Sequence, residues 1–158
     1  MKQILDTFMI FMTTLGNTGM IWIALIILLL IRKQTRFFGY LCLIALLSEY
    51  FINDMIIKDI VARDRPFIAH DLDILIKPPS GYSFPSGHSA SSFAIAGMFL
   101  LFKQKGRFLV LVIATFIAFS RVYLDVHYLS DVLVGIILGL AVAAIIYYKY
   151  YRSTISNT

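Results

Sequence analysis

The sequence predicts an all-α integral membrane protein, a helical bundle of about five transmembrane helices preceded by an N-terminal interfacial helix. Of its 158 residues, 59% are hydrophobic and only 15% are charged, and the mean hydropathy is +0.83. Soluble domains carry about 25% charged residues. Several apolar runs approach the roughly 20 residues that cross a bilayer. A chain of this length predicts a single membrane-embedded domain over residues 1–158.

The apolar runs give the elements in order. The predicted spans cover residues 20–31 with some residues upstream, 37–57, 89–102, 108–123 and 128–148. The third span begins in small residues, SASSFAIAG, which permit close contact between helices. Residues 1–14 are less hydrophobic and carry Lys2 and Asp6, so we interpret them as an interfacial or partly inserted helix.

Cations between and after the spans predict the orientation. They form three groups, at residues 32–36, 103–107 and 149–152. With five spans these groups share one side of the membrane, which the excess of positive charge marks as cytoplasmic. The net charge of +5 then reflects span-flanking cations and anionic lipids, and we expect no nucleic acid partner. The long loop at residues 66–84 falls outside a bacterial plasma membrane.

A histidine and a carboxylate stand four residues apart at the start of the fifth span. On a helix His127 and Asp131 would share one face. The carboxylate could then accept a hydrogen bond from one imidazole nitrogen and leave the other nitrogen free to attack an electrophile. The alternatives are an interfacial helix cap and a metal pair. The metal pair lacks further His, Cys or carboxylate ligands nearby.

The tetrapeptide Pro-Ser-Gly-His, residues 85–88, precedes the third span. Ser86 can cap that helix, and amide groups at a helix N-terminus bind anions. Gly87 lets a ligand approach the backbone closely. His88 would then stand beside a bound phosphate, where it could donate a proton to a leaving oxygen. By itself, Pro-Ser-Gly is also compatible with an ordinary turn.

Three cations lie at span ends on the predicted outer side, where positive charge is scarce. Lys58 ends the second span, Arg65 follows seven residues later, and Arg121 ends the fourth span. Arginine forks and a lysine point charge suit the oxygens of a phosphoryl group. Any one of these cations could instead reach out of the membrane from a span end. Three of them on this side favour a phosphate site.

Taken together, these segments resemble the type 2 phosphatidic acid phosphatase superfamily, the membrane relatives of vanadium haloperoxidases. The pattern of that family is Lys-x6-Arg-Pro, Pro-Ser-Gly-His and Ser-Arg-x5-His-x3-Asp, and this chain reads KDIVARDRP, PSGH and SRVYLDVHYLSD. The resemblance implies that His127 attacks phosphorus to form a phosphohistidine, that Asp131 orients it and that His88 protonates the leaving group. It also implies that the phosphate oxygens are held by Lys58, Arg65, Ser86, Gly87 and Arg121, without a metal ion or other cofactor.

The resemblance implies hydrolysis of a lipid phosphate or diphosphate. A site on the outer face favours undecaprenyl diphosphate, a carrier that is dephosphorylated outside the cell for recycling; phosphatidylglycerol phosphate and phosphatidic acid are the alternatives. Two other classes of protein fit less well. A transporter or channel would carry its polar residues at mid-span, and a structural membrane protein has no need of two histidines and three cations at one rim. The expected partners are the lipid substrate and membrane lipids.

Overall fold

The computed structural model describes residues 1–156, and these residues form helices and connecting loops without a strand. The prediction of an all-α fold is confirmed. The elements in order are α1 (Lys2–Gly16), the 3₁₀ turn η1 (Asn17–Gly19), α2 (Met20–Ile31), α3 (Arg36–Tyr50), the π-helical segment η2 (Phe51–Ile57), α4 (Lys58–Val61), α5 (Pro66–Ala69), α6 (Gly87–Leu101), α7 (Arg107–Tyr123) and α8 (Leu129–Ser156).

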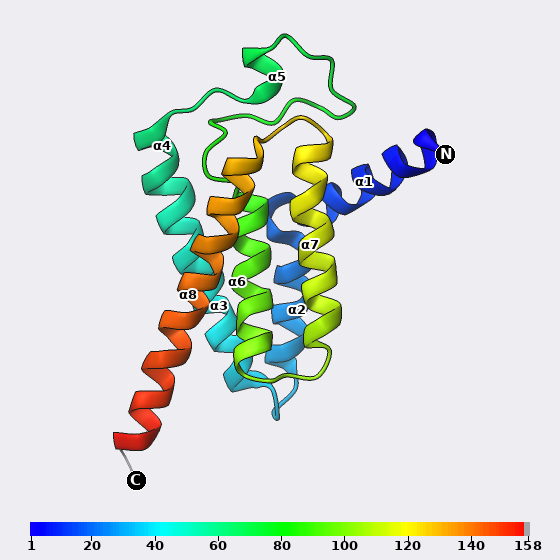
Figure 1. Cartoon of the computed structure of the whole chain (residues 1–158). Helices are drawn as coiled ribbons and strands as arrows, with labels where there is room; N and C mark the ends of the chain where they lie inside the picture. Colours follow the sequence, from blue (N-terminus) through cyan, green and yellow to red (C-terminus); the bar gives the residue numbers. More distant parts are fainter. Residues whose placement is uncertain (157–158) are drawn as a thin grey trace.

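Helix α6 lies among the other long helices, and Figure 1 shows α2, α3, α7 and α8 around it. Every residue of α6 from Ser89 to Phe99 is buried. Glycines on α8 let its backbone pack directly against the backbone of α6. A Cβ on Gly135 would lie 2.6 Å from the Ser86 carbonyl oxygen, and a Cβ on Gly139 would overlap the carbonyl oxygen of Ala90. The short side chains of this seam therefore fix how α8 presents its first turn to the start of α6.

Three helical stretches are long and apolar enough to cross a membrane, at residues 2–31, 36–69 and 129–155. Helix α6 is apolar but shorter. Large apolar side chains face outward, among them Leu28, Leu109 and Ile137, each more than 60% exposed, as expected of surfaces that contact lipid. The predicted spans correspond to α2, α3 with η2, α6, α7 and α8, and their number stays a prediction. Within the second of these segments, the continuous helix formed by α3, η2 and α4 runs past the predicted end at residue 57 and ends at Val61, because Ala62 leaves the helix at φ 48°. Helix α5 follows after the non-helical residues 62–65.

The N-terminal helix projects away from the bundle axis (Figure 1). The bend between α1 and α2 comes from two consecutive residues with positive φ, Thr18 at 52° and Gly19 at 68°. Helix α1 packs against α7, where Phe8 and Phe116 make an edge-to-face contact at 5.2 Å. It ends at Gly16, two residues later than the predicted end at residue 14.

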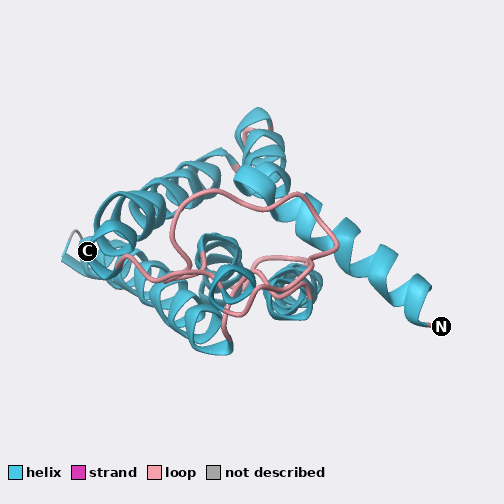
Figure 2. Ribbon diagram, turned by 90° about the horizontal axis from the view of Figure 1, so that it is seen from above, coloured by secondary structure: helices cyan, strands magenta, loops and turns pink. Residues whose placement is uncertain are grey.

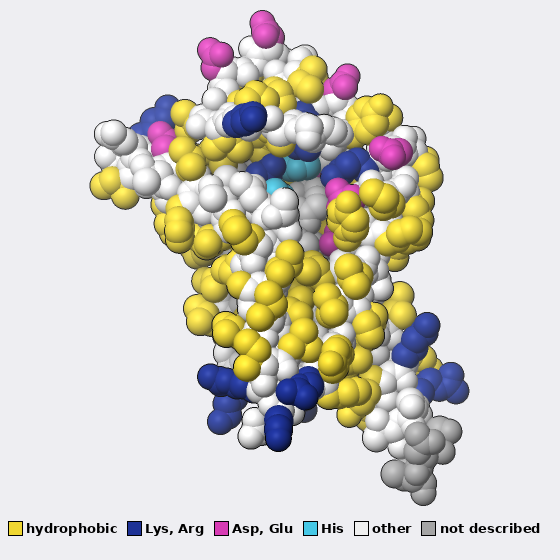
Figure 3. Space-filling view, turned by 180° about the vertical axis from the view of Figure 1, so that it is seen from behind, with side chains coloured by type: hydrophobic (Ala, Val, Ile, Leu, Met, Phe, Trp, Pro, Cys, Tyr) yellow, Lys and Arg dark blue, Asp and Glu magenta, His cyan; other side chains and the backbone are white. Residues whose placement is uncertain are grey.

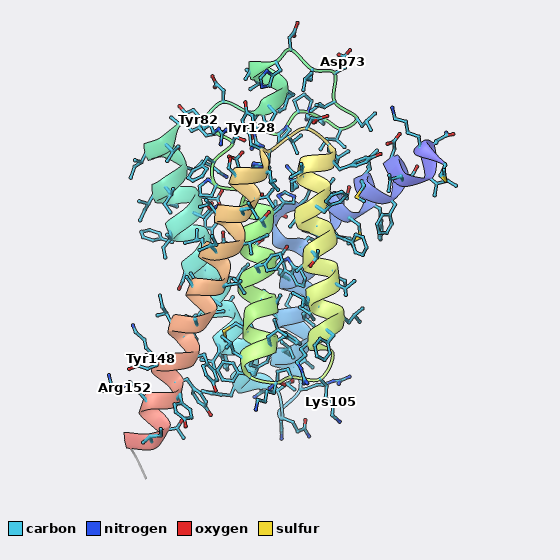
Figure 4. All side chains as sticks on the ribbon, viewed as in Figure 1. Asp73, Tyr82, Lys105, Tyr128, Tyr148 and Arg152 are labelled. Atoms are coloured by element: carbon cyan, nitrogen blue, oxygen red, sulfur yellow. The ribbon has the colours of Figure 1, made fainter. Side chains whose placement is uncertain are left out.

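The two ends of the bundle differ in charge. Figure 3 shows Lys and Arg side chains gathered at the end opposite the long loop. Figure 4 places Lys105 and Arg152 at that end, and Asp73, Tyr82 and Tyr128 at the other. Seen along the bundle in Figure 2, the loop crosses above the helix ends. The three motif segments around residues 58–66, 85–88 and 120–131 therefore share the end that this loop covers, as the sequence predicted.

Candidate active site

The histidine–carboxylate pair lies at the junction of α7 and α8. Helix α8 begins only at Leu129, so His127 lies in the preceding turn and not on a helical face with Asp131, as the sequence interpretation had placed it. The reason is local, because Asp131 Oδ2 accepts the backbone N–H of Tyr128 at 3.0 Å and so caps the helix start. The side chains still meet, with His127 Nδ1 3.5 Å from Asp131 Oδ2. Both are buried, at 3% and 0% exposure.

Two residues that the sequence analysis missed complete the environment of Asp131. Ser83 donates its hydroxyl to Oδ2 at 2.5 Å, and its Oγ also lies 3.4 Å from His127 Nδ1. Arg63 Nη1 donates to the other oxygen, Oδ1, at 2.7 Å, and its guanidinium lies over the Tyr128 ring at 3.8 Å from the centroid. Hydrogen bonds and charge thus hold this buried carboxylate in its ionised, acceptor form.

The second nitrogen of His127 faces a buried arginine. Arg65 Nη1 lies 3.2 Å from His127 Nε2 and donates to the Val126 carbonyl at 3.0 Å. Arg65 Nε and Nη2 donate to the carbonyls of Gly81 and Ser80, at 2.9 and 3.1 Å. Backbone acceptors from the long loop therefore fix the guanidinium beside the imidazole, with 4% of the residue exposed.

Burial lowers the pKa of His127 to about 4. The neighbouring Asp131 carboxylate acts in the opposite direction, while the nearby charges of Arg121 and Arg65 lower the pKa further. The imidazole is therefore neutral at pH 7. With its Nδ1 proton directed at Asp131, the neutral ring presents the Nε2 lone pair, which is the form that a nucleophile needs.

The start of α6 is built as the sequence predicted. Ser86 is its N-cap and accepts the backbone N–H of Ser89 at 3.4 Å. The backbone N–H of Ser86 donates to the Asp131 carbonyl at 3.0 Å, which joins this turn to α8. Gly87 is the first residue of the helix, and a Cβ there would lie 3.2 Å from Asp54 Oδ2. The N-terminus of α6 therefore adjoins the backbone of Asp131 at the start of α8 and the side chain of Asp54 in η2.

The other cations have partners outside the predicted set. Lys58 Nζ makes an ion pair with Asp54, four residues earlier, and the two side chains are 16% and 25% exposed. Arg121 Nη1 donates to the Thr13 hydroxyl of α1, and its Nε has no hydrogen-bond partner within residues 1–156. Arg121 is only 2% exposed. Buried guanidinium N–H groups of this kind are available to an anion.

His88, in the first turn of α6, contacts the N-terminal segment. Its Nε2 lies 3.0 Å from Asn17 Oδ1 of η1. Figure 3 shows a hollow beneath the long loop in which histidine, Lys and Arg side chains are visible from outside. The structure thus brings to one end of the bundle all the predicted site residues, namely Lys58, Arg65, Ser86, Gly87, His88, Arg121, His127 and Asp131. The arrangement combines a neutral imidazole, a helix N-terminus and several cations, which suits transfer of a phosphoryl group.

Comparison with known proteins agrees with this arrangement. Residues 37–155 match the model of a family described as the PAP2 superfamily. The chain is 34% identical over 137 residues to an undecaprenyl-diphosphatase of Sulfolobus acidocaldarius, covering 85% of this chain and 66% of that protein. It is 30% identical over 151 residues to the undecaprenyl-diphosphatase BcrC of Bacillus subtilis, covering 96% and 76%. It is 42% identical over 95 residues to a decaprenylphosphoryl-5-phosphoribose phosphatase of Mycobacterium tuberculosis, of which it spans half.

Two crystal structures have the same fold. The PAP2-type phosphatidylglycerolphosphate phosphatase of Bacillus subtilis superposes with a TM-score of 0.76 and 28% identity, over 96% of this chain and 78% of that one. Aquifex aeolicus LpxE gives a TM-score of 0.79 and 28% identity, over 90% and 85%. Both are similar to this chain over nearly all of its length.

Proposed function

Because the chain belongs to the PAP2 superfamily, we propose that it hydrolyses a lipid phosphate or diphosphate through a phosphohistidine at His127. The observation that carries this proposal is the environment of His127. One ring nitrogen meets a buried carboxylate at 3.5 Å, and the other faces a guanidinium at 3.2 Å. A neutral, oriented imidazole beside fixed positive charge can attack phosphorus while its partner stabilises the charge on the phosphoryl oxygens.

In the first step His127 Nε2 forms a bond to phosphorus as the bond from phosphorus to the leaving oxygen breaks. The leaving oxygen takes a proton from His88, and the positive charge that develops on His127 is stabilised by Asp131. In the second step water attacks phosphorus and gives a proton to His88, and the bond between Nε2 and phosphorus breaks. The products are inorganic phosphate and a lipid alcohol, or a lipid monophosphate when the substrate is a diphosphate.

The cations and the start of α6 together stabilise the negative charge on the phosphoryl group as it is transferred. Lys58, Arg65 and Arg121 supply N–H donors and positive charge. The amide groups at Ser86 and Gly87 add the positive end of the helix dipole. This set supplies the charge neutralisation that magnesium provides in many other phosphoryl-transfer enzymes, so the proposed reaction needs no metal ion.

Undecaprenyl diphosphate is the proposed substrate. Two relatives that align over 85% and 96% of this chain are named for that activity. Phosphatidylglycerol phosphate is the second candidate, since one superposed structure and a relative that is 35% identical over 113 residues carry that name. Phosphatidic acid is a third candidate. The cations at the other end of the bundle favour a site on the outer face of the plasma membrane, where a carrier lipid would be recycled.

Phosphate release from purified, detergent-solubilised protein tests the proposal. We expect release from undecaprenyl diphosphate with a higher kcat/KM than from phosphatidylglycerol phosphate or phosphatidic acid. Acid-labile label from a ³²P-substrate should remain on wild-type protein after rapid quenching and be lost in His127→Ala, together with turnover. Release of phosphate by His127→Ala at a near-normal rate would refute the mechanism. Absence of release from every lipid phosphate would favour a transporter or a structural protein instead.

A further inference from the structure

The N-terminal segment of residues 2–19 reaches the candidate active site, although it lies outside residues 37–155 that match the family. We propose that Asn17 and Thr13 are positioning residues of this site: Asn17 keeps a proton on His88 Nε2, and Thr13 orients Arg121. The inference rests on the proposed function and extends its machinery to a part of the chain that the family pattern does not include.

The contact between Asn17 and His88 has a defined direction. Asn17 Oδ1 lies 3.0 Å from His88 Nε2, and an amide oxygen can only accept a hydrogen bond. The contact therefore favours a proton on Nε2, because an unprotonated Nε2 would point its lone pair at the oxygen. A residue that protonates a leaving group must hold its proton before the substrate arrives. The hydrogen bond from Nε2–H to Asn17 therefore stabilises the imidazolium form of His88 and fixes the rotation of its ring. The proton on Nδ1 is then the one that His88 gives to the leaving oxygen.

The contact between Thr13 and Arg121 fixes a second side chain. Arg121 Nη1 donates to Thr13 Oγ1 across the interface between α7 and α1, where both residues are buried, at 2% exposure each. The Nε of the same guanidinium has no partner within residues 1–156. The N-terminal helix thus holds Nη1 of the guanidinium, while its Nε–H stays available to a phosphate oxygen.

The backbone of this segment is shaped to make these contacts. Thr18 adopts φ 52°, and a β-branched residue is rarely found in that region. Such a conformation costs roughly 1–3 kcal/mol and persists only where the surroundings require it. The turn directs Asn17 at the first turn of α6. Just before it, a Cβ on Gly16 would lie 2.6 Å from His88 Cδ2, so the end of α1 packs directly on the imidazole.

Anchoring of α1 does not explain the two polar contacts. The helix has its own attachments farther from the site, where Phe8 meets the Phe116 ring at 5.2 Å and Tyr123 donates to Asp6 at 2.6 Å. Those contacts hold α1 on α7 without any site residue. The hydrogen bonds of Thr13 and Asn17 end instead on two side chains that the motifs assign to phosphate binding and proton transfer.

A double-mutant cycle tests the role of Asn17. Asn17→Leu keeps the size of the side chain and removes the acceptor, whereas Asn17→Asp keeps an acceptor. We expect Asn17→Leu to lower kcat about tenfold, the effect of one lost hydrogen bond, for a lipid phosphate with a poor alkoxide leaving group. The loss should be small for p-nitrophenyl phosphate, whose leaving group needs no proton, and Asn17→Asp should retain activity. In a His88→Ala background Asn17→Leu should cost nothing more. Additive losses would overturn the inference, because they would mean that Asn17 acts on the fold.

Thr13→Val tests the second contact, with Thr14→Ala as the matched control. Thr14 is exposed, and its hydroxyl donates to the Ile10 carbonyl within α1. Thr13→Val should raise KM, and the inhibition constant of inorganic phosphate, severalfold more than it lowers kcat. Thr14→Ala should change neither. Equal effects of the two substitutions would contradict a role for Thr13 in orienting Arg121.

One measurement separates the inference from the proposed function. In protein labelled with ¹⁵N-histidine, the Nε2 shift of His88 should report a bound proton in the wild type, and Asn17→Leu should move it. An unchanged Nε2 signal in Asn17→Leu would overturn the inference even if the enzyme is active. A moved signal in a protein that releases no phosphate would leave the positioning role standing and refute the function.

Discussion

The hydroxyl of Ser83 lies between the two members of the histidine–carboxylate pair, 2.5 Å from Asp131 Oδ2 and 3.4 Å from His127 Nδ1. Ser83 is itself fully buried. The direct distance from His127 Nδ1 to Asp131 Oδ2 is 3.5 Å, longer than a good hydrogen bond. The serine therefore shares in transmitting the negative charge of the carboxylate to the imidazole.

We expect Ser83→Ala to lower kcat about tenfold to a hundredfold. The substitution removes a hydrogen bond to a buried charge, which contributes roughly 1.5–3 kcal/mol. Steady-state phosphate release measures the loss. Ser80→Ala is the control, since Ser80 is exposed in the same loop and contacts Arg65 through its carbonyl, which the substitution keeps. Unchanged kcat in Ser83→Ala would mean that Asp131 orients His127 without help.

The pH dependence should report the neutral state of His127. Its pKa of about 4 means that activity is lost only as pH falls toward 4, well below the usual 6.5 of histidine. Protonation removes the lone pair that attacks phosphorus. Because Asp131 raises this pKa, Asp131→Asn should move the acid limb to lower pH and also lower the plateau. Substrate ionisation is common to both proteins, so the shift between their profiles of kcat/KM belongs to the protein. A limb that moves to higher pH would contradict this assignment.

The same shift affects stability. In the unfolded chain the imidazole takes up a proton near pH 6.5, whereas in the folded protein it does so near pH 4. The unfolded state therefore binds more protons between these values, and the contribution of His127 to the free energy of unfolding falls as pH is lowered from about 6.5 to about 4.

Activity should survive chelation of divalent metals. Lys58, Arg65 and Arg121 supply the positive charge that a metal ion would otherwise bring to the phosphoryl oxygens. After dialysis against EDTA we expect the kcat/KM for the preferred lipid phosphate to stay within about twofold of the untreated enzyme, a difference of only ~0.4 kcal/mol. Complete loss of activity that magnesium or zinc restores would show that the phosphate site is incomplete without a metal.

Asp54 should compete with substrate for Lys58. Asp54 belongs to η2 and pairs with Lys58. Its carboxylate lies beside Gly87 at the start of α6, close to where a phosphate would bind. Asp54→Asn frees the lysine and removes a negative charge, so we expect KM, and the inhibition constant of inorganic phosphate, to fall about twofold to fivefold, which corresponds to the ~0.5–1 kcal/mol of a partly exposed ion pair. Asp59→Asn, on the exposed side of α4, is the matched control. A rise in KM would mean that Asp54 instead holds Lys58 in its binding position.

Site residues that belong to a local sequence pattern could be predicted, whereas those that depend on contacts between distant segments could not. His88 and Ser86 were predictable because a helix cap beside small residues is a local pattern, and the cap is present. Asp131 was predictable as a partner of His127 from their spacing, but the turn that keeps His127 off the helix was not. That turn depends on the carboxylate capping Tyr128, which a count of residues does not reveal.

The supporting residues could not have been found in this way. Ser83 stands in a loop and Asn17 in the short 3₁₀ turn η1, where no periodicity marks them. Their partners lie 48 and 71 residues away in the sequence. Arg63 lies inside the first motif at a position where the pattern accepts any residue, yet it pairs with Asp131 at 2.7 Å. The π-helical stretch of η2 likewise has no signature in FINDMII. These features arise from packing between distant segments, which a single sequence does not display.

The distribution of charge predicts on which side of the membrane the site lies. The cations at residues 32–36 and 103–107 lie in the connections after α2 and α6, at the end of the bundle opposite the site (Figure 1). Figure 4 places Arg152, of the group at residues 149–152, at the same end. Cytoplasmic segments of membrane proteins are enriched in Lys and Arg, so the loop at residues 66–84 is expected outside. Cys42 is fully buried and can stay in place as an unreactive thiol.

Single cysteines introduced at Leu75 and at Lys105 test this orientation in intact cells. Both positions are exposed, Leu75 in the loop over the site and Lys105 in the turn between α6 and α7. An impermeant maleimide should label the cysteine at position 75 at once and the one at position 105 only after the membrane is opened. The reverse pattern would turn His88 and His127 toward the cytoplasm. The proposed chemistry would stand, but a substrate recycled on the outer face could not reach the site, and a lipid phosphate of the inner leaflet would replace undecaprenyl diphosphate as the first candidate.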